Sequence, residues 1–115
     1  MKEATAIMSS VAAYIDGNYG DHNLSLTSVS DIFSISEPYL SCIFKQTLGI
    51  NFFNYIEDVR IDKAKEYLKK SDLSVGEIAD HVGYSSSNSF CRAFKRVVGF
   101  SASEYRRNNT SKQPV

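Results

Sequence analysis

The sequence predicts an all-α protein in which a long helix joins two helix-turn-helix units. Residues 24–55 and 73–105 repeat each other, and a period of this size indicates a duplicated structural unit. Each copy contains two short stretches with helix start signals, separated by a tight turn. The longest expected helix covers residues 51–70, which follow the second helix of the first copy and lead to the first helix of the second copy.

The two copies align at two offsets. At an offset of 49, Leu24, Ser25 and Ser36 pair with Leu73, Ser74 and Ser85. At an offset of 50, Phe44, Lys45, Gly49 and Tyr55 pair with Phe94, Lys95, Gly99 and Tyr105. One residue is therefore inserted between the two helices of the second copy. Because a helix-turn-helix places its second helix in a DNA major groove, the repeat predicts two DNA-reading helices.

Start and stop residues define the helices of the first half. A helix over residues 4–15 places apolar side chains on one stripe, namely Ile7, Val11, Tyr14 and Ile15, before Gly17 and Gly20 stop it. Ser25 is the expected N-cap of a helix over residues 26–33. Ser36 caps the following helix, which has Pro38 in its first turn and ends at Gly49.

The long helix is expected to begin near Asn51 and to end near Lys70. Its packing candidates are Phe52, Tyr55, Ile56, Val59, Ala64, Tyr67 and Leu68. Twenty helical residues span roughly 30 Å, close to the roughly 34 Å between successive major-groove segments on one face of B-DNA. A rigid helix of this length could let one monomer read two adjacent turns of DNA.

Capping boxes mark helix starts in the second half. The pairs Ser74 with Glu77 and Ser101 with Glu104 have the S-x-x-E spacing that satisfies two backbone N–H groups. We expect the helix-turn-helix units over about residues 24–50 and 73–100, within one domain over residues 1–107. Residues 108–115 are polar and aperiodic, and are expected to form a flexible tail.

Composition argues against several classes of protein. No apolar run approaches 18 residues, and no N-terminal segment combines a basic start with an apolar stretch, which favours a soluble, cytoplasmic protein without a membrane partner. Cys42 and Cys91 form no CxxC and, with His22 and His81, lack zinc-site spacing, so neither a disulfide framework nor a metal site is expected. Because HExxH, GxSxG and Gly-rich phosphate loops are missing, we expect neither an enzyme nor a cofactor.

The net charge is zero, which by itself counts against a nucleic-acid binder. The charges are unevenly distributed, however. Residues 1–58 carry two basic and seven acidic residues, a net charge of −5, whereas residues 59–115 carry eleven basic and six acidic residues, a net charge of +5. We therefore expect the second half to meet a polyanion, the alternative being that the charges only solvate helix faces.

Four stretches of the sequence are the most specific for a family, namely LSCIFKQTLG (40–49), YIEDVRIDKA (55–64), SVGEIADHVGY (74–84) and FCRAFKRVVGFSASEYR (90–106). Together they resemble the DNA-binding domain of the AraC/XylS family of bacterial transcription regulators. The resemblance covers residues 7–107 and implies about seven helices, sequence-specific binding to double-stranded promoter DNA and a contact with RNA polymerase. It also implies a sensing or receiver domain that would supply dimerisation, which these 115 residues do not include.

The resemblance assigns DNA contacts to both recognition helices. On the first, base edges would face Pro38, Ser41 and Cys42, and phosphates would face Lys45 and Gln46. On the second, the matching base-facing residues are Ser87, Asn88, Cys91 and Arg92, with Lys95 and Arg96 at phosphates. Asn88 could pair with adenine and Arg92 with guanine, each worth about 1–3 kcal/mol of discrimination. We expect the second unit to supply most of the affinity.

The sequence departs from the family pattern at four positions. Cys42 stands where several relatives carry Arg, so the first unit lacks a bidentate contact with guanine. Ser30 replaces a favoured Ala and Ser89 a favoured aromatic residue, and both are expected to cost packing. Ala102 replaces a common Pro and is expected to loosen the last turn.

Structural roles compete with these assignments. Arg60 and Arg106 have acidic neighbours, Glu57 and Glu104, and we expect salt bridges or surface packing rather than base contacts. Lys45 and Lys95 could cover their own helices. The cysteines are expected to be small, partly exposed residues, and the repeated aromatic residues Phe44, Tyr55, Phe94 and Tyr105 are expected to pack in cores. The alternative function is a helical protein-interaction module that kept the fold but binds DNA weakly.

Overall fold

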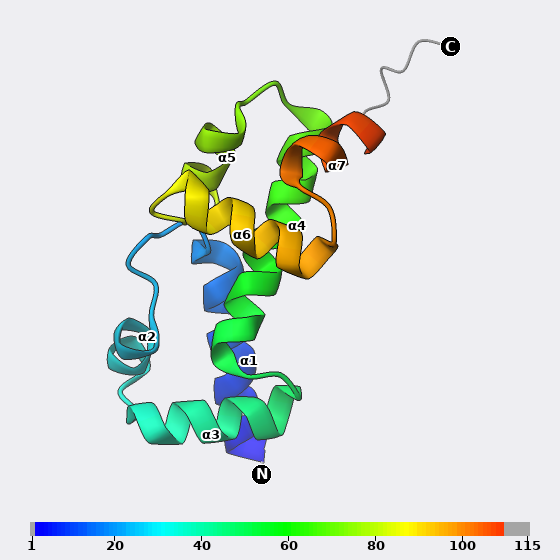
Figure 1. Cartoon of the computed structure of the whole chain (residues 1–115). Helices are drawn as coiled ribbons and strands as arrows, with labels where there is room; N and C mark the ends of the chain where they lie inside the picture. Colours follow the sequence, from blue (N-terminus) through cyan, green and yellow to red (C-terminus); the bar gives the residue numbers. More distant parts are fainter. Residues whose placement is uncertain (1, 110–115) are drawn as a thin grey trace. The chain divides into compact units, whose positions relative to one another are not determined.

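The computed structural model describes residues 2–109 (Figure 1), and this part of the chain forms seven helices and no strand. The helices are α1 (Lys2–Asn18), α2 (Leu26–Phe33), α3 (Glu37–Leu48), α4 (Phe52–Lys70), α5 (Val75–His81), α6 (Ser87–Val98) and α7 (Ala102–Asn109). The predicted all-α class is therefore confirmed. α7 includes the first two residues of the expected tail, and residues 110–115 of that tail lie outside the described residues.

The helices divide into two compact units, one ending at Glu57 and the other beginning at Asp58. The boundary lies inside α4, so this helix contributes its first turns to the first unit and its remaining turns to the second. None of the helices in residues 2–109 is long and apolar enough to cross a membrane.

In the first unit, α1 and α2 both pack against α3. The buried apolar side chains are Met8, Val11, Ile15, Val29, Leu40, Phe44, Phe52 and Ile56. The predicted stripe of α1 is rotated slightly, because Met8 is fully buried whereas Ile7 and Tyr14 are half-buried. Tyr55 joins α4 to α1 by donating a 3.0 Å hydrogen bond from its hydroxyl to Asp16 Oδ1. Desolvation, together with this bond, raises the pKa of Tyr55 to about 12.

In the second unit, α6 packs between α5 and α7. The buried apolar side chains are Ile61, Ala64, Leu68, Ile78, Ala79, Val82, Phe90, Ala93, Phe94 and Ala102. Ile61, which is absent from the packing candidates of the long helix, is 1% exposed. Ala102 begins α7 with a buried side chain, beneath the reciprocal bonds between Ser101 and Glu104 that form the predicted capping box.

The turns of the two units match residue for residue as far as Ile35 and Tyr84. Ser34 ends α2 in the left-handed conformation with a φ of 57°, and its counterpart Gly83 has a φ of 102°. The next backbone N–H groups, of Ile35 and Tyr84, both donate to carbonyls five residues earlier in the chain. The N-cap of α6 is Ser86, whereas the alignment had paired Ser36 with Ser85. That pairing is wrong because the extra residue is Ser85, which lengthens the turn before the cap.

Candidate nucleic-acid interface

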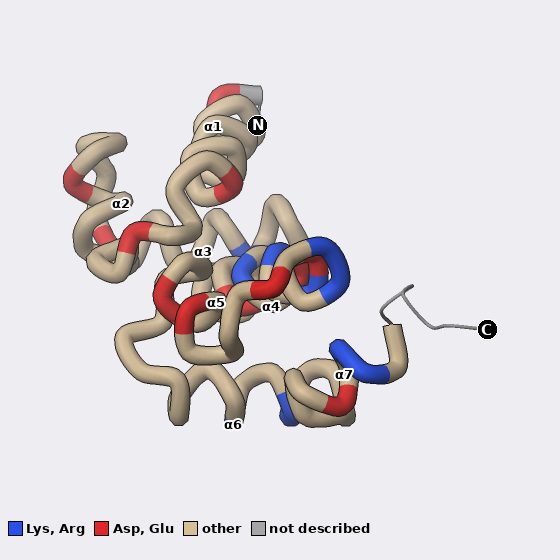
Figure 2. The backbone as a smooth tube through the Cα atoms, turned by 90° about the horizontal axis from the view of Figure 1, so that it is seen from above, with Lys and Arg blue, Asp and Glu red and all other residues tan. Residues whose placement is uncertain are grey.

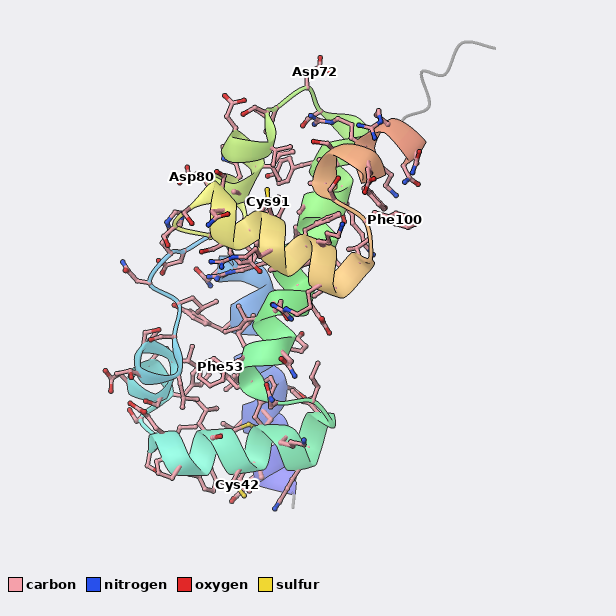
Figure 3. The ribbon with its side chains drawn as sticks, in the orientation of Figure 1. Cys42, Phe53, Asp72, Asp80, Cys91 and Phe100 are labelled. Carbon is pink, nitrogen blue, oxygen red and sulfur yellow. The ribbon has the colours of Figure 1, made fainter. Side chains whose placement is uncertain are left out.

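The predicted contact residues all lie on exposed faces of two helices. The predicted contact residues of α3 are all exposed, namely Pro38, Ser41, Cys42, Lys45 and Gln46. Those of α6 are exposed as well, namely Ser87, Asn88, Cys91, Arg92, Lys95 and Arg96. Figure 3 labels Cys42 on α3 and Cys91 on α6, and both thiols are free. The sequence predicted partly exposed cysteines, and both Cys42 and Cys91 are exposed.

The opposite faces of α3 and α6 are anchored by the same aromatic contact. The ring centroids of Phe44 and Tyr55 are 5.5 Å apart with the rings inclined at 73°, and those of Phe94 and Tyr105 are 5.5 Å apart at 71°. Phe44 and Phe94 are fully buried. These residues therefore pack in the cores as expected, and the repeat fixes each exposed face by the same edge-to-face geometry.

Arg60 supports the turn that precedes α6. Its guanidinium carbon lies 5.6 Å from the centroid of the Tyr84 ring, within the range of a cation–π contact. The Tyr84 ring in turn lies 5.5 Å from that of Phe90, on the buried face of α6. Arg60 thus has a packing role, as expected, and contacts α6 indirectly, through the rings of Tyr84 and Phe90.

Arg106 holds α7 against the end of α4. Its Nε donates to the carbonyl oxygen of Leu68 at 3.1 Å and its Nη2 donates to that of Ser71 at 3.0 Å. The sequence predicted a structural role for Arg106, but with an acidic side chain as its neighbour. The partners are backbone carbonyls: that of Leu68 lies in the last turn of α4, which leaves it without a helical donor, and that of Ser71 follows the helix. No spacing pattern in the sequence signals such contacts.

The family departures have local explanations. Ser30 is 3% exposed, and its hydroxyl donates to the carbonyl oxygen of Thr27 at 2.9 Å, so its polar group is satisfied inside the core. Ser89 is exposed, and its hydroxyl accepts a 3.0 Å bond from Ser86. The expected packing cost at Ser89 is therefore wrong, since its side chain faces away from the core.

The two recognition helices differ in charge. α3 carries one acid, Glu37, and one base, Lys45, whereas α6 carries Arg92, Lys95 and Arg96 and no acid. The backbone coloured by charge shows the same asymmetry, with acidic positions along α1 and α2 and most basic positions on α4, α6 and α7 (Figure 2). This difference agrees with the expectation that the second half meets a polyanion.

Hydrogen bonds to the two capping carboxylates of the second unit, Glu77 and Glu104, lower their pKa values. The bond from the Ser101 backbone N–H holds the pKa of Glu104 below its usual range, and nearby Lys95 and Arg107 lower it further. The same bond from Ser74 lowers the pKa of Glu77. Among residues 2–109, no group of three or more His, Cys, Asp or Glu side chains is arranged to hold a metal ion.

Known proteins share both this sequence and this fold. A family model described as a helix-turn-helix domain matches residues 29–108. The uncharacterized HTH-type transcriptional regulator YijO of Escherichia coli K12 is 41% identical over 89% of this chain and 36% of its own length. The arabinose operon regulatory protein of the same organism is 34% identical over 81% of this chain and 32% of its own length.

Among solved structures, the C-terminal domain of AraT, a response regulator from Geobacillus stearothermophilus, is similar. It superposes with a TM-score of 0.91 at 35% identity, over 95% of this chain and 90% of that domain. The chain spans about a third of the length of the curated relatives named above. The match over most of the two helix-turn-helix units, together with these relatives, shows that the chain belongs to the AraC/XylS family of transcription regulators.

Proposed function

We propose that this chain binds double-stranded promoter DNA in a sequence-specific manner and regulates transcription in bacteria. One observation carries the proposal: α6 presents Arg92, Lys95 and Arg96 on an exposed face while its other face is buried through Phe90, Ala93 and Phe94. A firmly packed helix with a cationic outer face is suited to entry into a major groove, where it lies between two rows of phosphates.

The proposed roles follow the chemistry of each side chain. On α6, Asn88 pairs with adenine and Arg92 with guanine, while Ser87 and Cys91 make smaller contacts with base edges. Lys95 and Arg96, one turn later, contact phosphates and set the position of the helix. On α3, Pro38, Ser41 and Cys42 face the bases and read mainly groove shape, with Lys45 and Gln46 at the backbone.

The remaining features of the proposal come from the family. α4 holds the two recognition helices in adjacent major-groove segments of one duplex. RNA polymerase is a partner at the promoter, and a sensing or receiver domain supplies dimerisation in the full regulator. The protein acts in the cytoplasm, with neither a catalytic activity nor a cofactor of its own.

Selection of binding sites from random duplexes, followed by affinity measurements over a salt series, tests the proposal. We expect one enriched site, and the logarithm of its affinity should fall linearly with the logarithm of salt concentration, because each phosphate contact contributes a slope of about −0.9. If the chain enriches no site and shows no salt-dependent binding to DNA, the alternative function as a protein-interaction module is favoured instead.

A further inference from the structure

The first turns of the two recognition helices differ in their capacity to accept a phosphate. α3 begins with Glu37 and Pro38, whereas α6 begins with Ser87 and Asn88. A helix N-terminus favours anions because its backbone N–H groups lack helical partners and its dipole is positive there. In α3 a carboxylate already occupies this region, and Pro38 has no N–H to donate. In α6 the first turn has no acidic residue.

The Glu37 carboxylate is held in a defined place. Thr27 Oγ1 donates to Glu37 Oε2 at 2.7 Å, which links the first turn of α2 to the first turn of α3. Glu37 is half-buried in this position, whereas Ser87 at the corresponding place in α6 is exposed. The negative charge therefore lies beside the N-terminal turns of α2 and α3.

We propose that Glu37 repels DNA phosphates from the N-terminus of α3 and thereby limits the sequence-independent affinity of the first unit. This inference rests on the proposed function. Lys45 is the single basic residue of α3 and lies in its last turn, so it is too far along the helix to neutralise the repulsion in the first turn. DNA of any sequence is attracted mainly by α6, and α3 adds affinity only where the groove fits its small side chains.

Glu37→Gln tests the inference because glutamine keeps the shape and can still accept the bond from Thr27. The affinity of the 115-residue chain should rise about 3- to 10-fold at low salt, by the same factor for a selected site and for random duplex. The salt slope should become steeper by up to about one, and the gain should shrink as salt screens the charge.

Glu3→Gln is the matched control. Glu3 is likewise an acid in the first turn of a helix of the first unit, but its side chain is exposed and α1 is not a recognition helix. This variant makes the same change in net charge and should change the affinity by less than about twofold, because solvent and salt screen an exposed charge away from the contact surface.

Ser87→Glu is the reciprocal variant, and it keeps the inference testable if Glu37→Gln unfolds. It places an acid in the first turn of α6, where the repeat puts the counterpart of Glu37. Affinity for random duplex, which does not depend on the proposed contact of Ser87 with a base edge, should fall several-fold, and the salt slope should become shallower.

Three results would overturn the inference: an unchanged affinity for a folded Glu37→Gln variant, a loss confined to one base pair of the selected site, or an equal gain from Glu3→Gln. The loss at one base pair would instead mean that Glu37 accepts a hydrogen bond from a base. If the unmodified chain shows no salt-dependent binding, the proposed function itself fails, which separates the two failures.

Discussion

Among single residues, Ser34 shows how the two copies solve the same backbone problem differently. It is the one non-glycine residue with a positive φ in residues 2–109, at 57°, and its counterpart in the second unit is a glycine. A residue with a Cβ atom pays about 1–2 kcal/mol in this conformation, whereas glycine adopts it without steric cost.

Replacing Ser34 with Gly should therefore stabilise the first unit. The gain should be about 0.5–1 kcal/mol, since the greater flexibility of glycine in the unfolded chain offsets part of the relief. Thermal unfolding should show a melting temperature a few degrees higher. Gly83→Ala should lower it, because φ there is 102°. A lower melting temperature for Ser34→Gly would mean that the serine side chain stabilises the turn.

Arg106 should matter for stability although its neighbour Arg107 does not. Arg106→Ala leaves the carbonyls of Leu68 and Ser71 without their donors, and should cost about 1–3 kcal/mol. Arg107→Ala removes an exposed side chain and should change stability by less than about 0.5 kcal/mol. Denaturant unfolding of both variants measures the difference, and equal losses would contradict the assigned role.

At the scale of helices, the capping residues made the elements predictable. Ser25, Ser36, Ser74 and Gly49 stand at the helix ends where the sequence placed them, because each satisfies local backbone groups that no distant contact can replace. The cap of α6 was harder to place because the run of serines from Ser85 to Ser87 offers three candidates. The buried position of Ile61 depends on tertiary packing, which helical periodicity alone does not fix.

The two capping boxes of the second unit should make its stability depend on pH. The folded-state pKa values of Glu77 and Glu104 lie below the usual value of 4.5. Their contribution is therefore present above about pH 4.5 and is lost as the pH falls through the lowered values. Melting temperatures measured from pH 6 to pH 3 should fall less steeply in the double variant Glu77→Gln, Glu104→Gln. An identical slope would show that these bonds are not linked to folding.

Two variants of the recognition helix α6 should affect different properties, one the sequence specificity of binding and the other the affinity for DNA of any sequence. Arg92→Ala should relax preference at one base pair by about 1–3 kcal/mol, because the proposed bidentate contact with guanine is lost. Arg96→Ala should weaken binding to all sequences alike and flatten the salt slope by about one. Site selection and salt titration of each variant measure these effects. An intact site preference in Arg92→Ala would reject its base contact.

For the whole molecule, the repeat predicted two units and their internal contacts, but it did not predict where they divide. The boundary after Glu57 falls inside α4 because the first turns of this helix pack on Phe44 and the later turns pack on the second unit. Among candidate site residues, the exposed faces of α3 and α6 followed from helical phase. The bond between Thr27 and Glu37 did not, because it joins side chains ten residues apart across a turn.

We propose that one chain docks both recognition helices along the same side of a duplex, joined by α4. Hydroxyl-radical footprinting of the 115-residue chain on a selected duplex tests it most directly. We expect two protected segments centred about 10 base pairs apart on one face of the DNA, with the stronger protection under α6. A single protected segment, or two segments on opposite faces, would contradict the claim.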